Sequence, residues 1–340
     1  MAGGVITLVT GASGFLGSHV TDLLVGRGER PRLLIAPDEP MQPLPVGEVD
    51  LRRGDICDAG DVRDAVRGVD CVLHCAAKTG PWGPQAEYER TNVRALESLV
   101  RLAADAGVRR LVHVSSITVH GNDVGGWADE ETPFREEPNP YSRSKVAAER
   151  VLIRLSAEQV LPITIVRPGW IYGPRDRASF ARLARKLEAG QMVIIGPGTN
   201  HLPLVYVRDA ARGVLLAAQA PGATGRAYAL VNDEPITQLD YLSAIAQELG
   251  TTVPSRRLPY RLALTLGAGA EAAGRLTRRR QPPPVMRYGV QMLGGENRFS
   301  IDRAREELGF TPRVSMLDGV GRSIRWYRML PEHATRLVAA

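Results

Sequence analysis

The 340-residue sequence contains little cysteine and little lysine, and each scarcity excludes a class of protein. Cysteine occurs only at Cys57, Cys71 and Cys75, an odd number with no second pair at zinc-ligand spacing. This predicts buried thiols in a reducing compartment and no disulfide framework. Lysine occurs three times, so the formal charge of +6 comes from arginines spread along the chain. Such a spread does not favour nucleic-acid binding.

The sequence also lacks a long apolar run and a recognisable leader. The longest apolar stretch of the C-terminal half, Leu262–Ala270, is too short to cross a bilayer. The chain enters the β-rich segment Val5–Thr10 without the charged region, apolar core and cleavage site of a signal peptide. No histidine or acidic pair recurs at metal-ligand spacing. We therefore expect a cytoplasmic enzyme with no bound metal, no stable membrane insertion and no nucleic-acid partner.

The densest basic run of the chain comprises Arg275, Arg278, Arg279 and Arg280. It is followed at once by Gln281-Pro282-Pro283-Pro284, a sequence typical of an irregular segment. We therefore predict a solvated loop here. The alternative is a site for an acidic substrate or a lipid headgroup.

The hydrophobic share of 44% and the charged share of 24% are typical of a soluble globular protein. Short β-branched or aliphatic runs alternate with longer amphipathic stretches, which predicts an α/β fold with a Rossmann-type doubly wound parallel sheet. The expected strands are Val5–Thr10, Arg32–Ile35, Cys71–Cys75, Arg110–Ser115, Pro162–Arg167 and Arg226–Val231. The expected helices are Leu16–Arg27, Ala59–Val66, Gln85–Ala106, Tyr141–Leu155, Ala178–Ala189, Arg208–Ala218 and Leu239–Leu249. Residues 1–167, with 205–235 returning to them, form the predicted dinucleotide-binding domain, and residues 168–204 and 236–340 form a smaller substrate-binding lobe.

A glycine-rich turn joins the first strand to the first helix, in the sequence Thr10-Gly11-Ala12-Ser13-Gly14-Phe15-Leu16-Gly17. Gly11 permits a tight turn, Gly14 lets backbone N–H groups approach a pyrophosphate, and Gly17 lets the helix pack closely on the strand. The helix N-terminus then faces the phosphates. The alternative is a glycine-rich turn without a ligand. Cofactor contacts are expected from Gly11, Ser13, Gly14, Phe15, Leu16 and Gly17.

The end of the second strand normally selects NAD through an acid or NADP through an arginine. Here apolar residues stand where either charge is usual, and Asp38 comes two or three positions late. Because Asp38 would repel a 2′-phosphate, the sequence favours NAD weakly and leaves NADP open. Gly54-Asp55-Ile56, at the next strand end, places Asp55 and Ile56 against the adenine. A plain turn carboxylate explains Asp55 equally well.

A catalytic set is predicted at the start of the fourth helix. Asn139 is a plausible helix cap and Pro140 the first helical residue, so Tyr141 and Lys145 share one helix face. The Lys145 ammonium is expected to lower the pKa of the Tyr141 phenol and to hold the nicotinamide ribose. Ser116, at the end of a strand, can donate a hydrogen bond to a substrate oxygen, and its neighbour Ser115 is the alternative.

The glycine-rich turn, the Ser115-Ser116 strand end and the Tyr141 and Lys145 pair together resemble the extended short-chain dehydrogenase/reductase family. The resemblance covers essentially the whole chain. The resemblance implies that Ser116, Tyr141 and Lys145 are the catalytic triad and that Asn92 supports the active site. It also implies that Ala76, Ala77 and Lys78 lie beside the adenosine half of the cofactor. Pro168 and Gly169 would offer backbone atoms to the nicotinamide amide. The helix pair Gln85–Ala106 and Tyr141–Leu155 is similar to the family's four-helix dimer contact, so a homodimer is expected.

The branch of the family is indicated by Trp170, which stands where sugar-nucleotide epimerases and dehydratases usually carry an asparagine. With Asn297-Arg298-Phe299-Ser300, it makes the chain similar to 3β-hydroxysteroid dehydrogenases and 2-alkyl-3-oxoalkanoate reductases. This implies hydride transfer to or from an apolar ketone or secondary alcohol. Two alternatives stay open, a sugar-nucleotide epimerase or dehydratase using the same triad, and a silent dinucleotide sensor. The segment Pro259–Gly274 would suit an apolar pocket or simply pack on the sheet. Substrate contacts are expected from Thr118, Trp170 and His201.

Overall fold

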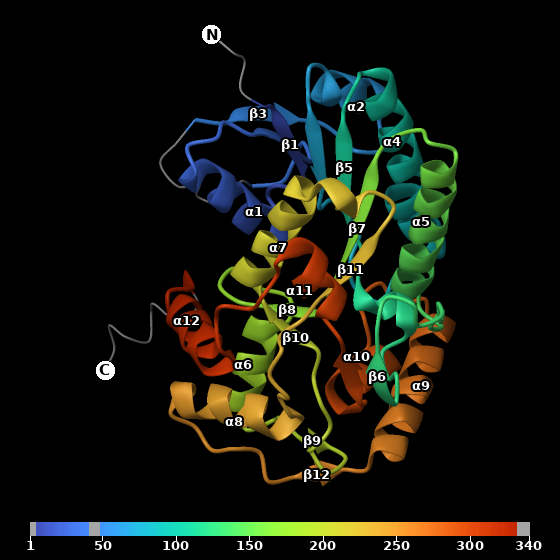
Figure 1. Cartoon of the computed structure of the whole chain (residues 1–340). Coiled ribbons are helices and arrows are strands. Elements are labelled where there is room, and N and C mark those ends of the chain that lie inside the picture. Colours follow the sequence, from blue (N-terminus) through green and yellow to red (C-terminus); the bar gives the residue numbers. More distant parts are fainter. Residues whose placement is uncertain (1–4, 41–47, 332–340) are drawn as a thin grey trace.

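The computed structural model describes residues 5–40 and 48–331. Its centre is a seven-stranded, fully parallel sheet with the order β11-β7-β5-β4-β1-β2-β3 (Figure 1). The predicted doubly wound fold is confirmed. The strand order reverses between β1 and β4, and at such a point a crevice forms outside the carboxyl ends of the strands. The seven strands are β1 (Thr7–Thr10), β2 (Arg32–Ile35), β3 (Asp50–Arg53), β4 (Cys71–His74), β5 (Arg110–Val114), β7 (Ile163–Pro168) and β11 (Ala227–Leu230).

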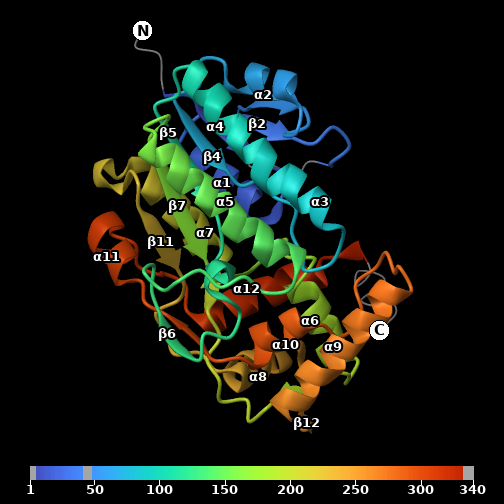
Figure 2. The same ribbon diagram turned by 90° about the vertical axis from the view of Figure 1, so that its right-hand side faces the viewer.

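Helices cover both faces of the sheet (Figures 1 and 2). One face is covered by α1 (Phe15–Gly26) and α7 (Val207–Gln219), and the other by α2 (Ala59–Val66), α4 (Ala95–Asp105) and α5 (Pro140–Ala157). Successive strand residues point to opposite faces, so Val9 joins one buried cluster and Leu8 joins the other. Burial on both faces explains why the inner strands are mostly apolar runs. The edge strand β3, Asp50-Leu51-Arg52-Arg53, is largely exposed and was not predicted because it lacks such a run.

The predicted helix Gln85–Ala106 is interrupted. It consists of α3 (Gln85–Tyr88), a π-helical turn (Glu89–Arg94) and α4. The wider turn carries the buried Asn92, whose amide bonds to the backbone of Lys78. A single π-helical turn within a helix frequently marks a functional site, and here it directs Asn92 toward the segment that follows β4.

The smaller lobe lies at the carboxyl edge of the sheet and consists of helices and three two-stranded parallel sheets. Its strand pairs are β8 (Trp170–Tyr172) with β10 (Leu204–Tyr206), β9 (Ile194–Ile195) with β12 (Arg257–Leu258), and β6 (Gly126–Ala128) with β13 (Asn297–Phe299). Its helices include α6 (Phe180–Glu188), α8 (Gln238–Leu249), α9 (Tyr260–Leu276), α10 (Arg287–Gly294) and α12 (Met316–Arg328), and α11 (Asp302–Leu308) packs beside β11. Strand β6 comes from the first half of the chain, so a piece of residues 1–167 is built into this lobe.

None of the helices in residues 5–40 and 48–331 has the length and apolar character needed to cross a membrane.

Candidate active site at the carboxyl edge of the sheet

The glycine-rich turn lies against the end of β4 and cannot accept side chains at two positions. Gly11 has a positive φ of 65°, and a Cβ there would lie 2.7 Å from the backbone of Ala76. A Cβ on Gly17 would lie 2.1 Å from the Gly11 carbonyl oxygen. The Gly11 N–H donates to the Leu34 carbonyl at 3.0 Å. This hydrogen bond holds the turn, which leads from β1 to α1, against strand β2. The turn is therefore shaped by backbone contacts that only glycine permits.

Helix α1 begins at this turn with its first amides open to a ligand. Gly14 is the N-cap residue, so no side chain caps the helix, and its first turn contains no acidic residue. The first N–H groups of a helix have no partner within the helix and attract an anion. The turn and the helix start together fit the pyrophosphate of a dinucleotide.

The carboxylate that reaches the glycine turn belongs to Glu39. The Ser13 hydroxyl donates a hydrogen bond to Glu39 Oε2, whereas Asp38 lies exposed in the loop after β2. Arg53, at the end of β3, donates to the Pro37 carbonyl at 2.8 Å and to the Glu39 carbonyl at 3.1 Å. Sequence reasoning missed Glu39 because these loop contacts, and not its position relative to β2, bring it back to the turn.

Asp55 acts as a turn residue, as the alternative interpretation expected. Its Oδ1 accepts the Cys57 N–H at 2.9 Å, and its own N–H donates to Asp61 Oδ2 at 2.8 Å. Its neighbour Ile56 packs against the buried cluster beneath α2 and α4. An adenine contact at this position stays a prediction.

Asn92 ties three segments together beneath the site. Its Oδ1 accepts the Lys78 N–H at 2.7 Å, and its Nδ2 donates to the Lys78 carbonyl at 2.9 Å and to Ser144 Oγ at 2.8 Å. Ser144 lies on α5, so the segment after β4 is held in a fixed position relative to that helix. The supporting role that the resemblance implied for Asn92 agrees with these contacts.

The structure brings Ser116, Tyr141 and Lys145 together. Helix α5 begins as expected, with Asn139 Oδ1 accepting the Ser142 N–H at 2.9 Å and Pro140 as its first residue. One turn into the helix, Lys145 Nζ lies 5.9 Å from the centre of the Tyr141 ring. Ser116 follows β5, caps the short 3₁₀ helix Ile117–His120, and bonds with the Tyr141 hydroxyl.

The electrostatics of this cluster differ from the prediction. Burial raises the pKa of Tyr141 to about 12, with hydrogen bonding to Ser116 acting in the opposite direction. Burial also lowers the pKa of Lys145 to about 8, against the pull of the Glu149 carboxylate. The expected lowering of the Tyr141 pKa is not found, because desolvation of the phenolate dominates. Lys145 Nζ donates to the Val114 carbonyl at 2.8 Å. In this state Tyr141 is a protonated phenol at neutral pH.

The choice between the two adjacent serines follows from their hydroxyl partners. The buried Ser115 donates to Glu149 Oε1, which is also bound by Arg167. Its hydroxyl is thus committed to a structural network away from Tyr141. Ser116 is only partly buried and faces Tyr141, so the geometry favours Ser116 over Ser115.

Aromatic contacts surround the predicted substrate residue Trp170 and the Tyr141 ring. Trp170 Nε1 donates to Ser179 Oγ at 2.8 Å, and its ring meets Tyr241 edge-on at 6.0 Å between centroids. Tyr288 of α10 meets Tyr141 edge-on at 6.4 Å. Nothing in the local sequence around Tyr288 predicted this contact. Thr118 is fully buried and donates its hydroxyl to Asn122 Oδ1 at 2.6 Å, so this hydroxyl is already engaged.

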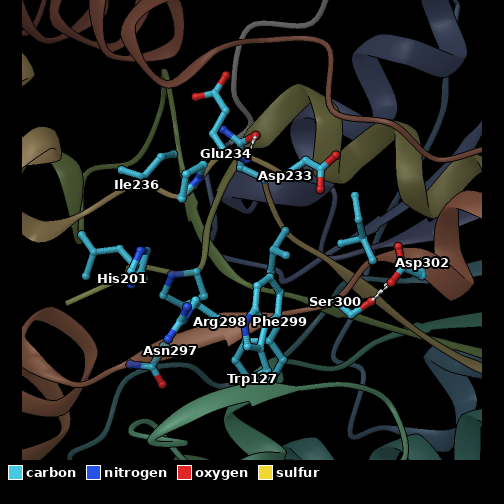
Figure 3. A pocket seen from close by; sticks show the side chains of 16 residues that line it. Trp127, His201, Asp233, Glu234, Ile236, Asn297, Arg298, Phe299, Ser300 and Asp302 are labelled. Atoms are coloured by element: carbon cyan, nitrogen blue, oxygen red, sulfur yellow. Dashed lines mark hydrogen bonds between the residues drawn. The ribbon is translucent and has the colours of Figure 1, made fainter. Parts of the chain in front are cut away.

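The predicted substrate residue His201 lies elsewhere. It borders a cavity of about 170 Å³, shown in Figure 3, whose lining also includes Trp127, Glu234 and Arg298 but none of the three residues of the cluster. Its Nδ1 lies 2.8 Å from Glu296 Oε1. His201 is joined to the β6–β13 pair, because the Asn297 N–H of β13 donates a hydrogen bond to the His201 carbonyl. The structure therefore does not bring His201 to the catalytic set.

The chain is similar to known proteins over most of its length. The model of the "NAD dependent epimerase/dehydratase family" matches residues 7–230. The chain is 32% identical to the 2-alkyl-3-oxoalkanoate reductase of Stenotrophomonas maltophilia, covering 93% of this chain and 97% of the relative. It is 30% identical to a 3-beta-hydroxysteroid dehydrogenase of Mycolicibacterium neoaurum, covering 94% and 90%.

Two solved structures share the fold. The crystal structure of gox2253 superposes with a TM-score of 0.81 at 31% identity, covering 96% of this chain and 99% of that one. DesIV of Streptomyces venezuelae, a dTDP-glucose 4,6-dehydratase with NAD and TYD bound, superposes with a TM-score of 0.78 at 26% identity, covering 96% and 98%. The chain therefore belongs to the NAD-dependent epimerase/dehydratase family of extended short-chain dehydrogenases/reductases, and is an NAD(P)-dependent oxidoreductase.

Proposed function

We propose that this enzyme transfers a hydride between nicotinamide and a ketone or secondary alcohol on a largely apolar small molecule. The observation that carries the proposal is the meeting of Ser116, Tyr141 and Lys145 at the same sheet edge as the glycine turn. The Tyr288 ring, which lies edge-on against Tyr141, supports an apolar substrate. The ring of Trp170, predicted from the sequence to contact the substrate, would add to this apolar surface. The reductase and dehydrogenase names of the relatives point the same way.

The bound nicotinamide supplies or accepts the hydride. In the reductive direction, the protonated Tyr141 hydroxyl gives its proton to the carbonyl oxygen of the substrate. Ser116 donates a hydrogen bond to the same oxygen and stabilises the charge that develops on it. Lys145 lies within one turn of Tyr141, where its ammonium would hold the nicotinamide ribose and favour the phenolate that is left once Tyr141 has given up its proton.

The cofactor is expected along the crevice where the strand order reverses. Residues 1–167 and 205–235 would hold it, and residues 168–204 and 236–340 would hold the substrate. Beyond the glycine turn and Glu39, the contacting residues are inferred to be Asp55, Ile56, Ala76, Ala77, Lys78, Pro168 and Gly169.

The alternative of a sugar-nucleotide epimerase or dehydratase makes an opposite prediction about cofactor use. A reductase consumes one reduced nicotinamide per substrate, whereas an epimerase regenerates its cofactor in each cycle. We expect β-ketoesters to cause stoichiometric loss of NADH absorbance and sugar nucleotides to cause none. Conversion of a sugar nucleotide without net cofactor consumption, together with no reaction of any ketone, would reverse the assignment.

Glu39 is proposed as the residue that makes the enzyme prefer NAD. Its carboxylate, held at the glycine turn by Ser13, can accept the ribose 2′-OH of NAD and repels the 2′-phosphate of NADP. We expect Glu39→Gln to lower the ratio of kcat/KM for NAD to that for NADP by about tenfold or more, since a charged hydrogen bond and a repulsion are both lost. Asp38→Asn, one residue away, is the matched control. A change in the ratio with Asp38→Asn alone would return the role to Asp38.

We also infer a homodimer formed through α4 and α5, whose neighbouring faces lie on the outside of the molecule (Figure 2). Ile153 on α5 is 52% exposed there, which a helix contact between two copies would bury. Sedimentation should give the mass of two chains, and Ile153→Arg should shift it toward one chain. A single-chain mass for the wild type would contradict the dimer. The three unpaired thiols support a cytoplasmic location.

A further inference from the structure

Helix α9 has three of its leucines on the side away from the protein, whereas Leu264 packs against the core. Leu262, Leu266 and Leu276 are 48%, 51% and 87% exposed. At about 100° per residue they fall within an arc of roughly 80°. A surface helix normally turns its large apolar residues inward, so this helix has the opposite arrangement.

The inward face of α9 explains why the leucines cannot be buried by rotation. It consists of Ala263, Gly267, Glu271 and Gly274, all buried. A Cβ on Gly267 would lie 2.8 Å from the Arg287 backbone nitrogen, and one on Gly274 would lie 3.1 Å from the Trp82 ring. Small residues are thus required where α9 meets α10 and Trp82. The close packing of this inward face therefore leaves the three leucines on the outside.

Exposed arginines lie at both ends of this apolar stripe. Residues 251–289 contain a single acid, Glu271, which is buried and bonded to Arg287 at 2.8 Å. We use the term α9 face for the three leucines and the flanking exposed arginines. These arginines are Arg256, Arg257, Arg261, Arg278, Arg279 and Arg280. Arg275 is left out because its guanidinium lies over the Trp82 ring on the inward side of the helix.

We propose that the α9 face docks on the surface of an anionic lipid bilayer. The leucines would enter the boundary between headgroups and acyl chains, and the arginines would contact lipid phosphates. With 17 residues the helix is about 25 Å long, shorter than the roughly 30 Å hydrocarbon layer, so it lies in the interface and does not span it. For the basic run, this proposal takes the lipid headgroup that the sequence left open as an alternative to a solvated loop.

Charge argues against two other occupants of this face. A second copy of the chain would bring two sets of arginines together with no exposed acid from residues 251–289 to neutralise them. A nucleic acid would neutralise the arginines but leave the three leucines in water. An anionic bilayer satisfies both parts of the face.

The position of α9 connects the docking surface with the active site. Helix α9 packs on α10, and Tyr288 of α10 contacts Tyr141. In both views α9 lies at the outer edge of the smaller lobe (Figures 1 and 2). If the proposed apolar substrate is correct, it could pass from the bilayer to the site across one layer of helices. Docking itself does not depend on that substrate.

The test is co-sedimentation of the full chain with two kinds of vesicle, phosphatidylcholine alone and an equal mixture with phosphatidylglycerol. We expect binding to the anionic vesicles to exceed binding to the neutral ones at least tenfold, and to fall as salt is raised. The variant Leu262→Ser/Leu266→Ser/Leu276→Ser should bind at least tenfold more weakly. Arg278→Gln/Arg279→Gln/Arg280→Gln should weaken binding about 100-fold.

Leu317→Ser is the matched control, because Leu317 is 63% exposed on α12 and lies outside the α9 face. Its vesicle binding should equal that of the wild type, and all variants should keep the wild-type unfolding temperature. Absence of wild-type binding, or binding that the α9 variants leave unchanged, overturns the proposal. A leucine variant that loses only a two-chain mass in sedimentation would assign the face to self-association, and retention of an oligonucleotide in place of vesicles would assign it to nucleic acid.

Discussion

Replacing Tyr141 with phenylalanine should reduce kcat by about 10³-fold and leave cofactor affinity unchanged. The substitution removes only the phenolic oxygen, and a positioned proton donor contributes about 10²–10⁴-fold to such reactions. The ring that packs edge-on against Tyr288 remains, so the pocket keeps its shape. Single-turnover oxidation of NADH with an accepted ketone measures the rate, and quenching of protein fluorescence by NADH measures binding.

Tyr228→Phe is the control for this experiment. The Tyr228 hydroxyl donates to Glu307 Oε2 at 2.7 Å, between β11 and α11. The substitution therefore removes a tyrosine oxygen that is remote from the proposed proton transfer. The control should change kcat by less than threefold, given that it touches no reacting group. A Tyr141→Phe enzyme with more than a tenth of wild-type kcat would show that another group protonates the substrate.

The parts of the site that could be predicted from sequence are those fixed by short-range geometry. The glycine turn follows from three glycines around one strand end, and the start of α5 follows from Asn139 and Pro140 next to Tyr141. In both cases the residues that determine the conformation lie within about two helical turns of the residues that they position. The alternation of apolar runs and amphipathic stretches likewise predicted six of the seven strands of the sheet, because those strands are mostly buried on both faces. It missed β3, an exposed edge strand with the sequence Asp50-Leu51-Arg52-Arg53.

The parts that could not be predicted depend on contacts between distant segments. Glu39 reaches the glycine turn only through a loop that Arg53 holds from another strand. His201 borders a cavity that contains none of the three catalytic residues, and it bonds to Asn297 of β13, almost a hundred residues later in the chain. The direction of the Tyr141 pKa was wrong because burial, which spacing along a helix does not reveal, outweighs the nearby ammonium.

The hydrogen-bonded network of Arg167, Glu149 and Ser115 should contribute most of the stability at the carboxyl edge of the sheet. Arg167, at the end of β7, donates through Nε and Nη2 to the Glu149 carboxylate on α5, the shortest bond being 2.6 Å. Its Nη1 donates to the Glu130 carbonyl at 2.9 Å. Ser115 after β5 bonds to the same carboxylate. One ion pair, with side chains 5% and 0% exposed, therefore joins β5, α5 and β7 where the proposed catalytic residues begin.

Arg167→Met should lower the free energy of unfolding by about 3–5 kcal/mol, because it leaves the Glu149 charge buried without its partner. Glu149→Leu/Arg167→Met should recover most of that loss, since the uncompensated charge is gone and apolar side chains of similar volume replace the pair. Arg67→Met, which breaks an exposed pair with Asp64, should cost no more than about 1 kcal/mol. Denaturant unfolding of the single and double variants gives the coupling energy directly. If the double variant is as unstable as the sum of the two single variants, the pair acts through separate contacts and does not hold the three elements as a unit.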